Sequence, residues 1–289
     1  MRNAKEILED EESDKRGIER GLVAHAFHPN PSLDQHFIYD RKLIRRITGI
    51  LEVEKDDVIF EIGAGIGTIT KEIPKCKRIY AVEIDKKAFS VLKNEIGKSS
   101  YIEPMNADAI ALLDAIPFTK IFSSTPFAIC EPLLNKLFTL DYSGAVLLLP
   151  KKFVDSVLSK KTKLGLFSDA FLDIKVEFEI ERESFYPIPR ARTVVVSIIR
   201  KEQDSPSDAL SGNERLENFL VRSFYLQRDK KLKNALREIF GKLFGLTKRQ
   251  AEKRITALSI SPITLEKLVE SMNYNDYQNV IEKIKSVGN

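Results

Sequence analysis

The sequence is poor in the residues that build disulfide frameworks and metal sites. Its 289 residues include only two cysteines, Cys76 and Cys130, which are far apart and have no metal-ligand spacing. We expect both to be free thiols with a structural role. The three histidines, His25, His28 and His36, do not stand with acids at ligand spacing. No metal site and no Ser-His-Asp or Cys-His catalytic arrangement is therefore predicted.

Long apolar runs are also missing. The longest, residues 145–149, is far too short to span a bilayer. The first twenty residues are acidic and contain no apolar run, unlike a secretory signal or an Arg-rich transit peptide. Hydrophobic residues make up 43% and charged residues 30%, the balance of a soluble globular protein. We therefore expect a cytoplasmic protein with no membrane partner.

Positive charge is concentrated in one region. The net charge is only +4, but residues 220–260 contain eleven basic residues against three acidic ones. Such a local excess is typical of a surface that faces a phosphate backbone. The alternative interpretation is an ordinary solvated helical face.

Short apolar runs alternate with helical patterns over the first two thirds of the chain. Strands are predicted at residues 58–62, 79–84, 101–105, 120–123 and 145–149. A glycine-rich turn and the start of a helix follow the first strand, and a helix is expected over 86–96. This alternation predicts an α/β domain with a mostly parallel sheet. Two more strands, 174–180 and 193–199, have no helix between them and should pair antiparallel.

Proline, glycine and polar residues mark the predicted boundaries. The segment 28–32 reads His-Pro-Asn-Pro-Ser and breaks any helix there. Residues 201–214 are polar, contain proline and glycine, and precede a pattern that stays helical to the end of the chain. We predict an extension over residues 1–30, the α/β domain over 31–203 and a helical domain over 204–289.

The first chemical motif is Glu-Ile-Gly-Ala-Gly-Ile-Gly at residues 61–67, directly after the first strand. Glycines let the backbone turn sharply and approach a ligand closely. Because Thr68 follows, the dinucleotide pattern G-x-G-x-x-G is not met, which disfavours a dehydrogenase. The acid before the glycines is typical of methyltransferase loops. The alternative is a tight turn without a ligand.

Carboxylates follow the next two strands. Glu83 ends the second strand, where its two oxygens can accept the ribose hydroxyls of a nucleoside. Asp85 is expected beyond the strand, facing solvent. Asp108 follows the third strand and can accept a hydrogen bond from an adenine amino group. Each acid alone is typical of a surface charge, but together they mark the strand ends where open α/β sheets bind ligands.

The fourth strand is followed by Ser124-Thr125-Pro126-Phe127, which fits the (D/N/S)-x-P-(Y/F) signature of amino-group methyltransferases. An exocyclic amine is a poor nucleophile because its lone pair is delocalised into the ring. The Ser124 side chain and the Thr125 carbonyl can accept its two N–H groups, and the Phe127 ring can stack on an extruded base. The alternative is a strand-ending turn with a core phenylalanine.

Taken together, these residues resemble the KsgA-type rRNA adenine dimethyltransferases and the related macrolide-resistance methyltransferases. The segment 34–38, Asp-Gln-His-Phe-Ile, is similar to the family's G-Q-(N/H)-F-L element. The segments 61–67 and 185–189 resemble its E-I-G-x-G-x-G and F-x-P-x-P elements. Residues 220–236 are similar to its F-x-x-R-R-K-x-L-x-N helix. The resemblance covers the chain from about Leu33 to near its C-terminus.

The resemblance implies a class I methyltransferase fold, Rossmann-like with a seven-stranded sheet, and a small C-terminal helical RNA-binding domain. It implies S-adenosylmethionine as the cofactor and small-subunit rRNA as the partner. The implied activity is the transfer of two methyl groups to N6 of each of two adjacent adenines. The implied cofactor contacts are His36, Ile38, Gly63, Gly65, Glu83, Asp108 and Ser124. The candidate RNA-binding residues are Arg228, Lys230, Lys231 and Lys233.

Three positions depart from the family pattern. Ser124 stands where the family has Asn, Phe127 where it has Tyr, and Asp34 where it has Gly. Two alternatives therefore stay open beside an active small-subunit enzyme. One is an rRNA-binding assembly factor of the same fold with weak or no catalysis, and the other is a 23S rRNA adenine methyltransferase. We expect a monomer.

Overall fold

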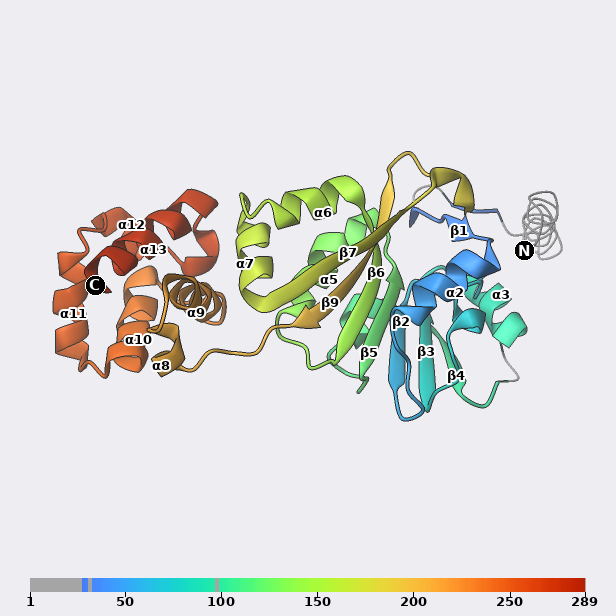
Figure 1. Cartoon of the computed structure of the whole chain (residues 1–289), viewed down its shortest axis with the longest axis horizontal. Coiled ribbons are helices and arrows are strands. Elements are labelled where there is room, and N and C mark those ends of the chain that lie inside the picture. The colour runs from blue at the N-terminus through green and yellow to red at the C-terminus, as the bar shows by residue number, and fades with distance from the viewer. Residues whose placement is uncertain (1–27, 31–32, 97–98, 289) are drawn as a thin grey trace. The chain divides into compact units, whose positions relative to one another are not determined.

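The structure is a computed structural model that describes residues 28–30, 33–96 and 99–288 (Figure 1). The predicted N-terminal extension, residues 1–30, lies almost wholly outside the described residues. The chain divides into two compact units. Unit 1 consists of Met1–Val154 and Ile174–Arg200, and unit 2 of Asp155–Asp173 and Lys201–Asn289.

Unit 1 is built on a seven-stranded sheet with the order β4-β3-β2-β5-β6-β9-β7. Its strands are β2 (Val58–Ile62), β3 (Arg78–Glu83), β4 (Ile102–Asn106), β5 (Lys120–Ser124), β6 (Gly144–Pro150), β7 (Leu172–Ile180) and β9 (Thr193–Arg200). The first five strands pair in parallel, and β9 runs antiparallel to β6. The predicted α/β class and the seven-stranded sheet of a class I methyltransferase are confirmed.

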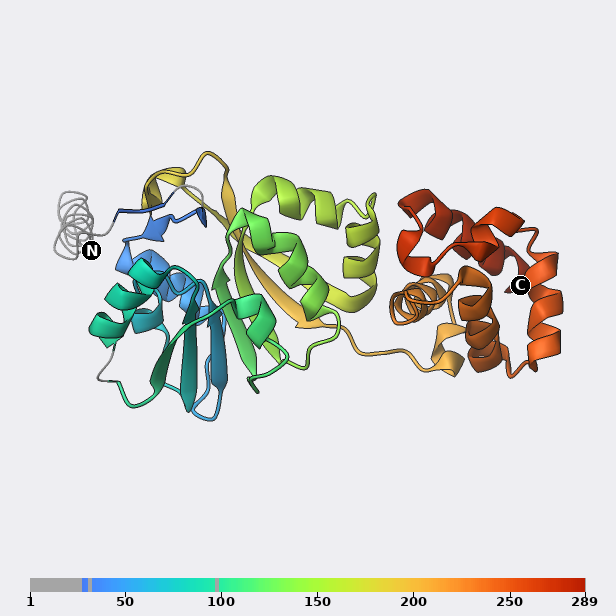
Figure 2. The same ribbon diagram turned by 180° about the vertical axis from the view of Figure 1, so that it is seen from behind.

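The inner strands of the sheet are buried because helices cover both of its faces. Figures 1 and 2 show helix α2 (Arg41–Gly49) on one face and α5 (Cys130–Leu137) on the other. Ile44 and Ile47 of α2 join the same core cluster as Ile59 of β2. The inner strand β6 is buried along almost its whole length, as its continuous apolar run requires.

Smaller elements complete the α/β layer. They are β1 (Phe37–Ile38), α3 (Lys86–Ile96), α4 (Ala109–Leu112), η3 (Phe127–Ile129), η4 (Arg182–Ser184) and β8 (Phe185–Tyr186). Helix α6 (Lys151–Leu158) contains the division between the two units, after Val154. β1 and β8 form a separate two-stranded sheet in which Phe37 pairs with Tyr186. This pairing holds the segment before α2 against the Pro-rich connection that precedes β9.

One predicted element differs. The sequence pattern predicts the start of an α-helix after the glycine loop, but the structure has only a 3₁₀ turn, η2 (Thr70–Glu72). The β-branched run Thr68-Ile69-Thr70 has lowered helix propensity, and Pro74 disfavours helical backbone at the residue before it. The glycine loop is therefore held in place by its own turns and by its hydrogen bonds with β3.

Unit 2 is helical. Its helices are α7 (Lys163–Phe171), α8 (Pro206–Ala209), α9 (Asn213–Tyr225), α10 (Leu232–Phe244), α11 (Lys248–Ala257), α12 (Pro262–Glu266), η5 (Val269–Ser271) and α13 (Tyr274–Gly288). The ring of Phe167 meets the rings of Tyr225 and Tyr277 edge-on, with centroids 5.1 and 5.4 Å away. The buried guanidinium of Arg222 donates to the carbonyls of Ala170 and Glu202 at 2.5 and 2.6 Å. Burial of this charge is offset by those two bonds.

Packing places residues 155–173 with the C-terminal helices, although they fall inside the predicted 31–203 domain. The predicted domain boundaries at residues 30 and 203 therefore remain predictions. The predicted linker includes α8 and the first residues of α9.

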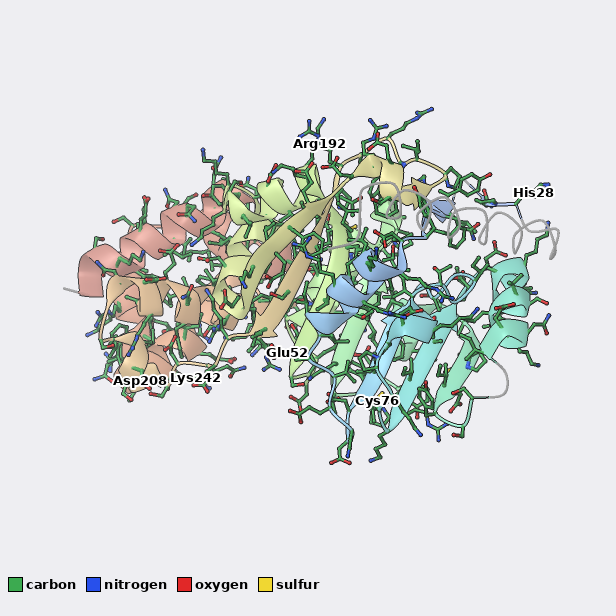
Figure 3. All side chains as sticks on the ribbon, turned by 45° about the vertical axis from the view of Figure 1, so that its right-hand side comes forward. His28, Glu52, Cys76, Arg192, Asp208 and Lys242 are labelled. Carbon is green, nitrogen blue, oxygen red and sulfur yellow. The ribbon has the colours of Figure 1, made fainter. Side chains whose placement is uncertain are left out.

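Both cysteine side chains lie in the interior of unit 1. Cys76 and Cys130 are both free and buried, as predicted (Cys76 is labelled in Figure 3). Within the described part of the chain, His, Cys, Asp and Glu side chains form no group that could hold a metal ion. Within the same residues, no helix has both the length and the apolar character to cross a membrane.

Candidate functional site

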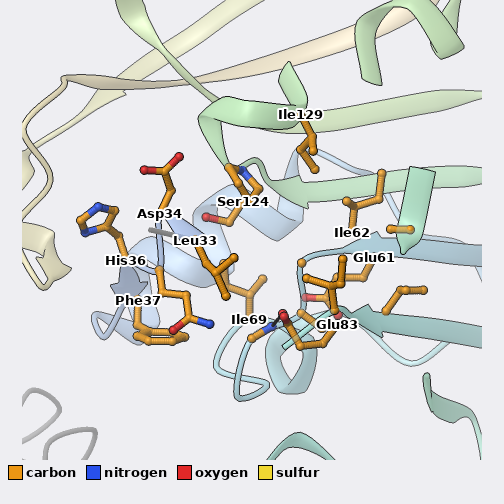
Figure 4. Close-up of a pocket in the computed structure, with 18 of the residues that line it drawn as sticks. Leu33, Asp34, His36, Phe37, Glu61, Ile62, Ile69, Glu83, Ser124 and Ile129 are labelled. Carbon is orange, nitrogen blue, oxygen red and sulfur yellow. Dashed lines mark hydrogen bonds between the residues drawn. The ribbon is translucent and has the colours of Figure 1, made fainter. Parts of the chain in front are cut away.

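A cavity of about 230 Å³ lies in unit 1 beyond the carboxyl ends of β2, β3 and β5 (Figure 4). This is where open α/β sheets bind ligands. The cavity brings together residues as far apart in the sequence as Leu33 and Ile129, which are 96 positions apart. All seven of the predicted cofactor contacts line it: His36, Ile38, Gly63, Gly65, Glu83, Asp108 and Ser124.

The glycine loop has the backbone that its sequence requires. Gly63, Gly65 and Gly67 have φ values of 71°, 58° and 85°, in the left-handed region. The amides of Gly63 and Ala64 both donate to the carbonyl of Val82, at 2.9 and 3.0 Å. A Cβ on Gly65 would lie 2.8 Å from Cε1 of Phe37. The loop can thus pass between β3 and the Phe37 ring only because it lacks a side chain there.

Glu83 ends β3 and is 7% exposed. Its Oε2 accepts from the Gly65 amide and its Oε1 from the Asp85 amide, both at 2.8 Å. Burial raises the pKa of the Glu83 carboxyl, and the two backbone donors oppose that rise. Each carboxylate oxygen has a second lone pair, so the group can still accept two hydroxyl donors from the cavity.

Asp85 lies just past β3, as predicted, but its side chain does not simply face solvent. It accepts from Nε2 of Gln35 at 2.9 Å and from the Lys87 amide at 2.8 Å. Gln35 in turn accepts from the Asn30 amide at 2.7 Å. The acid therefore ties the segment before β1 to the mouth of the cavity.

Asp108 begins helix α4. Its Oδ1 accepts from the Ile110 amide at 2.9 Å, which is the usual bond of a helix N-cap. The residue is exposed and lines the cavity, so its second oxygen can reach a ligand. One carboxylate thus combines a structural bond with a candidate binding role.

Glu61 is the functional residue that sequence reasoning undervalued, because it was interpreted only as part of the loop motif. It lines the cavity floor, is 2% exposed, and its Oε2 has no hydrogen-bond partner among the described residues. Burial, together with the charge of Glu83, raises the pKa of Glu61 to about 8. An unpartnered buried oxygen is costly, and a hydrogen-bond donor of a ligand would satisfy it. Its position near the end of β2, directly before the glycines, was the available signal.

The four-residue motif follows β5. The Thr125 amide donates to the Leu148 carbonyl at 3.2 Å, which fixes the backbone as it leaves the sheet. The Phe127 side chain is 43% exposed, so it is no core phenylalanine. The Phe127 amide donates to Oδ2 of Asp34 at 3.0 Å. Pro126 lines the main cavity, whereas Thr125 and Phe127 do not.

Thr125 and Phe127 line a second, smaller hollow of about 30 Å³ in the same unit. Asp34, His36 and Ser124 line both spaces, and Figure 4 shows these three side chains on one side of the main cavity. The Nδ1 atom of His36 lies 2.6 Å from the Pro187 carbonyl. Because a carbonyl only accepts, Nδ1 carries the proton in this contact.

The predicted RNA-binding residues lie in unit 2, and the structure pairs three of them with acids. Lys230 contacts Glu238 at 2.7 Å, Lys231 contacts Glu266 at 2.9 Å, and Lys233 also contacts Glu266. Hydrogen bonds from the two lysines lower the pKa of Glu266 to about 2.

Two further facts qualify that basic region. The Arg228 guanidinium lies over the Tyr225 ring, 5.0 Å from its centroid. Glu266 lies outside residues 220–260, so the local excess of basic residues found in the sequence does not include this acid. Among the described residues, Lys242 (Figure 3), Lys248, Arg249 and Lys253 are exposed and make no ion pair.

Comparison with known proteins gives consistent matches. A family model described as "Ribosomal RNA adenine dimethylase" matches residues 26–285. The chain is 28% identical over 223 residues to "Probable ribosomal RNA small subunit methyltransferase A" of Pyrococcus abyssi, covering 75% of this chain and 79% of the relative. Many further curated proteins match as well.

Two solved structures share the fold. A dimethyladenosine transferase from Plasmodium falciparum aligns with a TM-score of 0.57 at 21% identity, over 87% of this chain and 98% of that one. The 23S rRNA methyltransferase ErmE aligns with a TM-score of 0.54 at 17% identity, over 86% and 99%. At these identities the two structures establish the architecture only.

Proposed function

The chain belongs to the ribosomal RNA adenine dimethylase family, and from this premise we propose that its unit 1 cavity binds S-adenosylmethionine next to a target adenine. The protein is a methyltransferase that acts on adenine N6 in ribosomal RNA. The observation that carries the proposal is the junction of the two cavities, where Ser124 borders both. A methyl donor in one space and an amine in the other would meet there.

The described residues fit the cofactor. Glu83 offers acceptors for two ribose hydroxyls, and Asp108 offers one for an adenine amino group. The absent side chain at Gly65 leaves the backbone open to close approach. The unpartnered Oε2 atom of Glu61 suits a ligand group that donates a hydrogen bond. When bound, S-adenosylmethionine supplies a methyl group on a sulfonium centre, which is a strong electrophile.

The chain's own residues would position the amine. The Ser124 hydroxyl and the Thr125 carbonyl accept its N–H groups, which favours a nitrogen lone pair directed at the methyl carbon. Phe127, with its exposed ring, stacks on the extruded base. Such positioning converts a bimolecular step into an effectively unimolecular one and supplies much of the acceleration.

The substrate is proposed to be small-subunit rRNA, with two methyl groups added to each of two adjacent adenines. The Pyrococcus relative is named for the small subunit, which favours this target over 23S rRNA. Arg228, Lys230, Lys231 and Lys233 are the proposed RNA contacts, and RNA phosphates would compete with Glu238 and Glu266 for the lysines. We further propose that the protein is cytoplasmic and monomeric.

The test is transfer of label from radiolabelled S-adenosylmethionine to ribosomal subunits that lack adenine methylation. Small subunits are expected to accept label and large subunits are not. Label on large subunits alone would favour the 23S alternative. Tight binding to small subunits without any label would favour the assembly-factor alternative and overturn the proposal.

A further inference from the structure

We propose that Asp34 is a catalytic residue, whose carboxylate accepts the hydrogen bond and then the proton of the target amine at the junction of the two cavities. This inference rests on the proposed function. It assigns the role to a residue that lies 90 positions before Ser124 and outside the Ser-Thr-Pro-Phe motif.

The first observation is position. A side chain that borders both the cofactor cavity and the smaller hollow is well placed to touch the amine during transfer. Asp34, His36 and Ser124 are the side chains that line both. The proton on His36 Nδ1 is engaged by the Pro187 carbonyl. Asp34 is the one carboxylate of the three, and a carboxylate is the strongest hydrogen-bond acceptor among them.

The second observation is how Asp34 is held. Its Oδ2 accepts from the Phe127 amide at 3.0 Å. Oδ1 has no hydrogen bond among the described residues. One oxygen thus fixes the carboxylate against the backbone of the motif, and the other is available to a substrate. A group fixed in this way loses little freedom when it binds the amine.

The third observation is the backbone. Asp34 has φ = 51°, in the left-handed region where most side chains are disfavoured. An aspartate that occupies such a position is retained at a conformational cost, which points to a role for its side chain.

An acceptor of this kind suits the chemistry. The lone pair of N6 forms a bond to the methyl carbon while the carbon–sulfur pair returns to sulfur, which becomes a neutral thioether. The nitrogen gains a positive charge and must release one proton. Ser124 is neutral and its hydroxyl is short, so the N–H that it accepts is shared with Oδ1 of Asp34, while the Thr125 carbonyl accepts the other N–H. The Asp34 carboxylate stabilises the developing charge and takes the proton, which it then passes to water.

The test compares three variants with the wild type for kcat on small subunits and for cofactor affinity by calorimetry. Asp34→Gly suits the left-handed backbone, so the fold is not at risk. Asp34→Asn keeps an oxygen for the Phe127 amide but presents an amide donor to the substrate. The matched control is Asp141→Asn, an exposed aspartate without a hydrogen bond among the described residues.

Both Asp34 variants are expected to lose about a hundredfold in kcat, the scale of removing one positioned group. Their cofactor affinity should stay within about threefold, so the loss falls on the transition state. Adding Ser124→Asn to Asp34→Gly is expected to restore about tenfold, because the longer side chain supplies an acceptor. The Asp141→Asn control should match the wild type.

Other outcomes separate the two claims. A wild type that transfers no methyl overturns the proposed function and this inference together. An active wild type with an equally active Asp34→Gly overturns this inference alone. If Asp34→Asn keeps the wild-type kcat and only Asp34→Gly loses kcat, the role of Asp34 is limited to holding the Phe127 amide. That result would also overturn the inference.

Discussion

Glu83→Gln should weaken the binding of S-adenosylmethionine about thirtyfold. Glu83 presents two oxygens to the cavity, whereas glutamine presents one oxygen and a donor that cannot accept a hydroxyl. A hydrogen bond to a charged acceptor contributes about 1.5–3 kcal/mol. Loss of one such bond, about 2 kcal/mol, corresponds to about thirtyfold in Kd because about 1.4 kcal/mol is tenfold.

The same change also affects the fold. The amide of Gly65 or of Asp85 would face the new NH₂ group and lose its acceptor. An unsatisfied buried N–H costs about 1–3 kcal/mol, so the free energy of unfolding should fall by that amount. Isothermal titration calorimetry of folded protein measures binding apart from stability, with the exposed Glu103→Gln as the matched control. Unchanged affinity in Glu83→Gln would refute our placement of the ribose.

Three further perturbations have defined outcomes. The pKa of Glu61 is raised to about 8 from its ordinary 4.5, so the folded state holds a proton that the unfolded chain releases. The free energy of unfolding should therefore fall as pH rises from about 4.5 to about 8. Urea unfolding at several pH values should show this fall in the wild type and a weaker one in Glu61→Gln; the same slope of unfolding free energy against pH in both proteins would contradict the prediction. Glu266→Gln removes the acid beside Lys231 and Lys233, so rRNA affinity and its salt dependence should both increase, and filter binding at several salt concentrations checks this. In Gly65→Ala the new Cβ would lie 2.8 Å from Phe37, whereas in Gly144→Ala no atom lies within 4 Å of it. Gly65→Ala should therefore lower cofactor affinity more than Gly144→Ala. Equal affinities by calorimetry would argue against a close approach of the cofactor to the glycine loop.

Much of the sheet could be predicted because burial sets its pattern. The strand at 58–62 was predicted with the bounds of β2, and the others differ by one or two residues at their ends. Strands covered on both faces need continuous apolar runs, and those runs are visible in the sequence. The helix expected after the glycine loop was wrong because local propensity and Pro74 outweighed the usual motif context.

The candidate site was predictable where chemistry follows strand ends. Glu83, Asp108 and Ser124 were selected on that basis, and the structure places all three on one cavity. Contacts between distant segments leave no local pattern, so they were not predictable. The bond from the Phe127 amide to Asp34 spans 93 residues, and the pairing of Lys231 with Glu266 spans 35. The orphaned oxygen of Glu61 likewise depends on the whole surrounding core.

The most direct test of the account is to identify the modified nucleoside. Small subunits lacking adenine methylation would be incubated with the protein and S-adenosylmethionine, digested to nucleosides and analysed by mass spectrometry. We expect N6,N6-dimethyladenosine with the wild type and a strongly reduced yield with Glu83→Gln at limiting cofactor. Digests that contain only unmodified adenosine, from protein shown to bind the cofactor, would contradict the account.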